Sequence, residues 1–358
     1  MTARTAAAPV NRRAAPGPWA RMTWITWRQH RAALTGFALL FGGFAVLMLY
    51  AGVRVHDAYH TLVQHGCSVA SPVGPCGQAS ALFLGQPFDL YPNGVALALH
   101  VSPVLIGMFL GAPLLAREYE AGTLRFAWTQ GTGRTRWLLA QLTLLAVPVA
   151  AVSCGLAALA SWSSRPFEAL GYATRWQAGQ FDTTMITAVG WALAGFALGA
   201  LLGAVIKRTV AAMAVSAAAV TALAAAAYAK LDYLLLSVHP RTVADPSIVP
   251  ANVGQGALKS YAQQSYPVPR DSWLVRGWFA GPTGRPIGHA ALSALNRVRF
   301  GSNPSAAQLW LTRHHVTFLV AYQPAAHYWP FQAAAGGILL LAAAALAAAT
   351  LLLIRRRA

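Results

Sequence analysis

The apolar residues of this chain gather in six long blocks that polar and charged segments separate. None of the blocks contains Asp, Glu, Lys or Arg. Each block has about the 20 residues with which an α-helix crosses roughly 30 Å of hydrocarbon. Their length and their Ala- and Leu-rich content argue against strands and against the amphipathic helices of a soluble protein. The pattern therefore predicts an all-α polytopic membrane protein with six transmembrane helices, at Ala32–Gly52, Val95–Ala116, Trp137–Trp162, Thr183–Ile206, Val210–Ala229 and Gln332–Ile354.

The basic residues are unevenly divided between the segments that join these spans. Fifteen of the 27 Lys and Arg residues fall in four short pieces, residues 1–31, 117–136, 207–208 and 355–357, together with only two acids. These pieces alternate along the chain with three other connecting segments, of which the two shorter ones show no such excess. The third, residues 230–331, has nine basic residues and three acids, but long segments translocate largely regardless of their charge. Because short cytoplasmic loops carry the surplus of Lys and Arg, the four pieces and both termini are predicted to be cytoplasmic.

The composition of the chain narrows the class of protein to which it can belong. The chain has 358 residues, of which 56% are hydrophobic and 10% charged, and its net charge is +18. So few charges exclude an ordinary soluble enzyme, and so much apolar content excludes disorder. A basic chain of this kind is either a nucleic-acid binder or a membrane protein. The six blocks decide for the membrane, so the lipid bilayer is the expected partner and no nucleic acid is expected.

The blocks also divide the chain into regions. Residues 1–18 are expected to be a disordered basic tail. Residues 19–31 form either an amphipathic helix in the membrane interface or a simple aromatic and basic anchor for the first span. Residues 32–229 hold spans one to five, with the cytoplasmic loop 117–136. Residues 230–331 are expected to form a small extracellular subdomain with a helix at His289–Arg299, and residues 332–358 form span six and a basic cytoplasmic tail.

Two smaller patterns concern packing outside and inside the bilayer. Cys67 and Cys76 share the first outer loop, where they form either a disulfide in an oxidising exterior or two free thiols. Gly195, Gly199 and Gly203 make consecutive Gly-x-x-x-Gly steps in span four, which would let another helix approach closely. That helix belongs either to the same subunit or to a second copy.

The chain lacks the common sequence motifs of catalytic sites. The chain has no phosphate-binding Gly-x-x-x-x-Gly-Lys-Ser/Thr loop, no His-Glu-x-x-His pair and no Gly-x-Ser-x-Gly elbow. We therefore expect no catalytic residues, no metal site and no cofactor bound by this chain.

The second connecting loop is the most informative segment. It has two of the chain's nine acids, Glu118 and Glu120, followed by the helix-breaking pair Gly122-Thr123. Leu124, Arg125 and Trp128 then place a mixed apolar and basic surface in an aqueous loop. Such a patch indicates either a docking surface for a partner or an interfacial helix that rests on lipid.

This loop closely resembles the signature of type-2 ABC exporter permeases. In that family the second span ends in Arg-Glu-x-Glu-x-Gly-Thr, and a short Leu-rich helix and an Arg-containing turn lead into span three. Here the loop reads Arg-Glu-Tyr-Glu-Ala-Gly-Thr-Leu-Arg-Phe-Ala-Trp from Arg117 to Trp128, like a subgroup from GC-rich bacteria. The run into span six, Tyr322-Gln-Pro-Ala-Ala-His-Tyr-Trp-Pro-Phe-Gln332, also resembles that subgroup.

The resemblance implies a permease subunit in the bacterial cell membrane, which pairs with a second copy or a related subunit and binds separate ATP-hydrolysing subunits. ATP and Mg would then be bound by the partner ATPase. The coupling helix would comprise Glu118, Glu120, Gly122, Thr123, Leu124, Arg125 and Trp128. The cargo would be a hydrophobic or amphipathic compound. The alternatives are a membrane anchor or immunity protein without transport, and a membrane enzyme with an extracellular site.

Overall fold

The computed structural model describes residues 18–67, 76–84, 98–122, 134–170, 175–176, 178–234, 241–245, 272–299 and 304–356. Among these residues, six helices are long and apolar enough to span a membrane. The spans are His30–Gln64, Ala98–Glu120, Thr135–Ala169, Met185–Ile206, Thr209–Ala227 and Ala325–Arg356. The prediction of a polytopic helical membrane protein is therefore confirmed.

Span one belongs to α1 (Pro18–Gln64), which has 47 residues and is about 70 Å long at 1.5 Å per residue. Residues 19–31 continue into the span within this one helix, and their place in a membrane interface stays a prediction. The helix also continues well beyond Gly52, where we expected a loop, because no residue before Gly66 stops it. Gly66 has a φ of 62°, and the next N–H, that of Cys67, donates to Leu62 O at 3.0 Å, which ends the helix.

The second span is not a uniform α-helix. Residues 98–106 are α-helical, η1 (Gly107–Gly111) is a π-helical turn, and α4 (Ala112–Glu120) completes the span. The N–H of Ala112 donates to Gly107 O, five residues back. Pro113 follows directly and has no N–H to donate, so the regular α-helical ladder is interrupted here.

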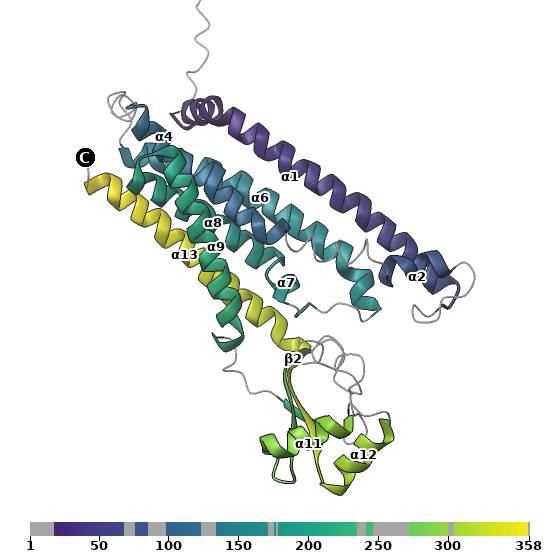
Figure 1. Cartoon of the computed structure of the whole chain (residues 1–358). Coiled ribbons are helices and arrows are strands. Elements are labelled where there is room, and N and C mark those ends of the chain that lie inside the picture. The colour runs from purple at the N-terminus through teal and green to yellow at the C-terminus, as the bar shows by residue number, and fades with distance from the viewer. Residues whose placement is uncertain are drawn as a thin grey trace, which may run out of the picture.

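The other spans pack around α8 (Met185–Ile206). This helix contacts η1 and α4, α6 (Arg134–Ala169), α9 (Thr209–Leu234) and α13 (Tyr328–Arg356). The short α7 (Ala178–Phe181) precedes it, and α1 packs against α6. Figure 1 shows α4 and the C-terminus at one end of the bundle. We call this end the basic end, because it carries Arg117, Lys207, Arg208, Arg355 and Arg356.

The segment between spans five and six folds separately from the bundle (Figure 1). It contains β1 (Arg241–Asp245), β2 (Trp273–Ala280) and β3 (Thr317–Gln323), which form an antiparallel sheet in the order β1-β3-β2. It also contains α11 (His289–Arg299), which confirms the predicted helix, and α12 (Pro304–Arg313). Their shared core consists of Phe279, Leu295, Leu311, Val316, Phe318, Val320 and Tyr322. The sheet is an addition to the all-α prediction, and η2 (Ala325–His327) leads from β3 into α13.

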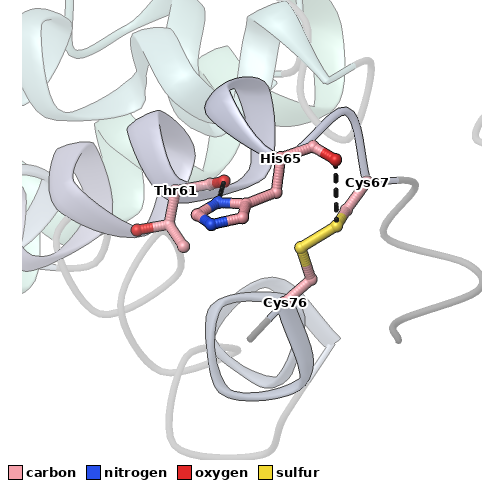
Figure 2. Close-up of a disulfide and its surroundings, with 4 residues drawn as sticks. All are labelled: Thr61, His65, Cys67 and Cys76. Carbon is pink, nitrogen blue, oxygen red and sulfur yellow. Dashed lines mark hydrogen bonds between the residues drawn. A yellow bond between two sulfur atoms is a disulfide. The ribbon is translucent and has the colours of Figure 1, made fainter. Parts of the chain in front are cut away.

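The far end of α1 carries a second small core with α2 (Cys76–Leu84). Val55, Ala58 and Leu62 of α1 pack with Ala79 and Phe83 of α2 and with Phe167 of α6. Figure 2 shows that a disulfide joins Cys67 and Cys76, whose Cα atoms are 6.3 Å apart. In the same view His65 Nδ1 donates to Thr61 O at 2.9 Å. The disulfide therefore ties α2 to the end of α1 that lies opposite the basic end.

The Cys67–Cys76 disulfide leads to a prediction of how many cysteine thiols react with a maleimide. Of the three cysteines, Cys154 alone should react with a maleimide in protein denatured without reductant, and all three should react after reduction. The variant Cys67→Ser should lower the free energy of unfolding by about 2 kcal/mol, because it frees the loop that the bond closes. The variant Cys154→Ser is the control and should leave stability unchanged. Three reactive thiols in unreduced protein would contradict the bond.

Candidate functional site

The segment that resembles a coupling helix begins in α4 at the basic end. The N–H of Ala121 donates to Arg117 O at 2.9 Å, and that of Gly122 donates to Tyr119 O at 3.3 Å. Gly122 has a φ of 67°, a conformation in which glycine carries no steric cost. The glycine of the Glu-x-Gly-Thr signature therefore ends the helix of the second span.

Glu120 holds the end of α4 against the start of α9. Its Oε2 accepts a hydrogen bond of 3.1 Å from the backbone N–H of Thr209, the first residue of α9. A carboxylate at this position satisfies a free N–H and complements the positive end of the helix dipole. Glu120 thus acts as a cap that a different span supplies.

The same turn makes a second contact with α4. Lys207 and Arg208 alone connect α8 to α9, and Lys207 adopts the left-handed conformation with a φ of 60°. The ammonium of Lys207 lies 5.3 Å from the centre of the Tyr119 ring, within the range of a cation–π contact. Spans two, four and five are consequently linked at the basic end.

Glu118 faces a different neighbour from Glu120. Residues two apart on a helix point about 200° away from each other. Glu118 is half-buried, and its charge acts on His30 of α1. The Nε2 of His30 in turn donates to Gln141 Oε1 of α6 at 3.1 Å. Glu118 and Glu120, although only two residues apart in the sequence, therefore do not form a carboxylate pair.

The rest of the predicted coupling helix is not part of the region that the structure describes. Thr123, Leu124, Arg125 and Trp128 lie outside the described residues. Their role in docking stays a prediction.

The glycine stripe of α8 faces the second span of the same chain. A Cβ atom at Gly195 would come within 2.5 Å of Pro103 O, and Cβ atoms at Gly199 and Gly203 would overlap the carbonyl oxygens of Gly107 and Ala112. Gly107 shows the converse, since a Cβ there would lie 2.6 Å from Gly195 O. Backbone meets backbone along this contact, and the structure places it within the subunit.

The run into span six builds a polar cluster that the sequence did not assign. Gln332 is fully buried, and its Nε2 donates to Phe181 O at 2.7 Å and to Thr184 Oγ1 at 3.1 Å. Its Oε1 accepts from Thr187 Oγ1 at 3.2 Å. Tyr328 OH is hydrogen bonded to Thr184 Oγ1 at 2.8 Å. This cluster fastens the start of α13 to the start of α8, at the end of the bundle away from the basic end.

One further polar contact lies near that cluster. His100 Nε2 of span two is 3.8 Å from Asp182 Oδ2, beside a cavity of about 40 Å³ whose lining includes Pro103 and Trp191. Because the partners are far apart in sequence, spacing alone does not reveal the pair. Among the described residues, no group of three or more His, Cys, Asp and Glu side chains is placed to hold a metal ion.

Comparison with known proteins identifies the family of the chain. A protein-family model described as "ABC-2 membrane transporter related" matches residues 38–231. A search of curated proteins and a search of solved structures each gave no match. The matched region begins within span one and runs through span five, and it includes the end of α4, the glycine stripe and the Lys207–Arg208 turn. Because it covers more than half of the chain and the described residues include six helices fit to span a membrane, the chain belongs to the ABC-2 membrane transporter related family, as a multi-pass permease component.

Proposed function

We propose that the chain is the permease subunit of an ATP-binding-cassette exporter in a bacterial cell membrane. Two permease subunits enclose the path, and a separate ATPase docks at the basic end, which faces the cytoplasm. The cargo is a hydrophobic or amphipathic compound. ATP and Mg belong to the ATPase, because the full sequence has no phosphate-binding loop.

The observation that carries this proposal is the linkage at the end of α4. Glu120 caps α9, and Tyr119 contacts Lys207 of the α8–α9 turn. A partner that pushes on residues 117–122 therefore pushes on spans two, four and five together. The close backbone contact of α8 with η1 leaves little room for one helix to slide without the other. Movement at the docking segment can thus reach the bundle as a rigid-body shift.

Charge reversal of the two acids tests the docking claim. The variants Glu118→Lys and Glu120→Lys should weaken association with the ATPase about tenfold and abolish its stimulation by the permease. Association is measured by co-purification of the ATPase with tagged permease in detergent, and stimulation by phosphate release after reconstitution. Each value is normalised to permease that elutes as a single folded species.

Two further variants separate docking from the cap. Glu120→Gln keeps an oxygen that accepts from Thr209 N–H, so it should preserve the fold and show how much the charge alone contributes. Asp57→Lys reverses an exposed acid near the far end of α1 and should behave as the wild type. Full association and stimulation in both Lys variants at the docking segment would overturn the assignment.

A further inference from the structure

The bundle has an apolar groove that its own helices do not fill. The groove has a volume of about 290 Å³, close to the lower range of ligand pockets, about 300–1,000 Å³. Its lining comes from α6, α8 and α13, including Leu142, Phe196 and Leu340. The one hydroxyl among the lining side chains, that of Thr143, donates to Leu139 O at 2.8 Å within its own helix. The groove therefore offers hydrocarbon contact and no free polar group to a side chain or ligand.

The groove lies in the half of the bundle nearest the basic end. Its residues on α6 run from Leu139 to Ala146, and α6 begins at Arg134. Its residues on α13 run from Leu340 to Leu351, and α13 ends at Arg356. At this depth the surrounding medium is the acyl-chain region of one leaflet, so water is not available to fill the groove.

Two arginines lie at the end of the groove where the hydrocarbon would give way to headgroups. Arg136 precedes Leu139 by three residues on α6, and Arg355 follows Leu351 by four on α13. Spacings of three and four residues keep side chains on one helix face. Both arginines are exposed, and neither forms an ion pair with a carboxylate of the described residues.

We propose that this groove holds an anionic phospholipid of the leaflet at the basic end. One acyl chain fills the space between α6 and α13 above the floor that α8 provides. The phosphate is bound by Arg136 and Arg355. Basic residues beside a cleft between transmembrane helices are the arrangement that recognises anionic headgroups.

The charge at the mouth argues for a lipid over a second copy of the chain. In a twofold dimer with its axis along the membrane normal, residues of equal depth face each other. The basic end of one copy would then lie beside that of the other, and Arg136, Arg355 and Arg356 would repel their counterparts. An anionic headgroup instead neutralises this charge.

Lipid retention by the full-length protein tests the proposal. The protein is reconstituted into vesicles with equal amounts of phosphatidylglycerol and phosphatidylcholine and then extracted in detergent. The lipids that stay bound are counted by native mass spectrometry. The wild type should retain phosphatidylglycerol in preference. The double variant Arg136→Ala/Arg355→Ala should lower that retention at least about fivefold per arginine and bring the two lipids to equal occupancy.

Matched controls address charge and shape separately. Arg356→Ala removes the neighbouring arginine, which points to a different face of α13, and should leave the preference intact. Ala344→Phe fills the groove and should remove both lipids, whereas Leu341→Phe, at a position 72% exposed and outside the lining, should not. Equal retention in the double variant and in Arg356→Ala would overturn the proposal. So would a loss of dimer with unchanged lipid in Ala344→Phe, which would assign the groove to a second copy.

Discussion

Replacing Gly199 with leucine is expected to prevent stable packing of α8 against the second span. Even a Cβ atom at this position would overlap Gly107 O and would lie 3.0 Å from the N atom of Ala112. These obstacles are backbone atoms of η1 and α4, so no side-chain rotation can relieve the collision. Overpacking of a well-filled core costs about 1–3 kcal/mol where neighbours can adjust, and a larger loss is expected here.

The measurement is the fraction of purified protein that elutes as a single species, together with its thermal unfolding in detergent. Gly155→Leu is the matched control, because Gly155 also lies in a membrane-spanning helix but a Cβ atom there would meet no neighbouring atom within 4 Å. We expect Gly199→Leu to aggregate or to unfold far below the wild type, and Gly155→Leu to match the wild type. Equal behaviour of the two variants would show that α8 and the second span are not in close contact.

The second large effect is expected at Gln332, whose side chain forms hydrogen bonds with several buried polar groups. In Gln332→Leu the carbonyl of Phe181 loses the donor 2.7 Å away, and Thr187 Oγ1 loses one of its acceptors. Phe181 O still accepts from Thr184 Oγ1 and Thr187 Oγ1 at 3.0 Å each. The cost is therefore that of the lost hydrogen bonds, about 0.5–1.5 kcal/mol each, so thermal unfolding should shift clearly downward. The start of α13 should loosen from α8 and become more accessible to protease.

A double-mutant cycle measures the coupling between Gln332 and Thr187, which share a hydrogen bond and the common acceptor Phe181 O. Thr187→Val keeps the side-chain shape and removes the hydroxyl that donates to Gln332 Oε1. If the bond contributes to stability, the two substitutions together should cost less than the sum of the single effects, by about 1 kcal/mol. Trp329→Leu alters an exposed neighbour on the same turn and serves as the control. Additive effects in the cycle would mean that the bond contributes nothing.

The membrane part of the fold is predictable from the sequence because lipid imposes a simple rule. A segment that crosses hydrocarbon must be long, apolar and internally hydrogen bonded, so block length alone finds the six helices. The end of the second span is also predictable from the sequence, since Gly122 follows its last helical turn. Span ends are less predictable where helix continues into water, as α1 does beyond Gly52.

Features that depend on tertiary contacts were not predictable. The glycines of α8 indicate a close contact, but only the structure identifies η1 as the surface that they meet. The π-helical turn lies where Gly107 and Gly111 meet the backbone of α8 and just before Pro113. The sheet had a local signal, because β2 and β3 are rich in aromatic and β-branched residues. The many prolines between spans five and six concealed it.

The candidate site likewise has a part that the sequence predicts and a part that depends on tertiary contacts. The motif places Glu118 and Glu120 in one segment, yet Glu120 bonds to Thr209, 89 residues away in sequence. No spacing rule links those two positions. The cap is a consequence of how α4 and α9 meet, and it gives the signature a structural task besides the docking that we propose.

In-cell crosslinking tests the central claim, that an ATPase docks at the end of α4, most directly. A photoreactive amino acid is placed at Ala121, which is exposed at the basic end, and separately at Arg285, which is exposed in the segment between spans five and six. After irradiation, crosslinked products are purified and identified by peptide mass spectrometry. We expect a protein with a phosphate-binding loop to be crosslinked at position 121 and not at position 285. No such protein at position 121, or equal yields at both positions, would contradict it.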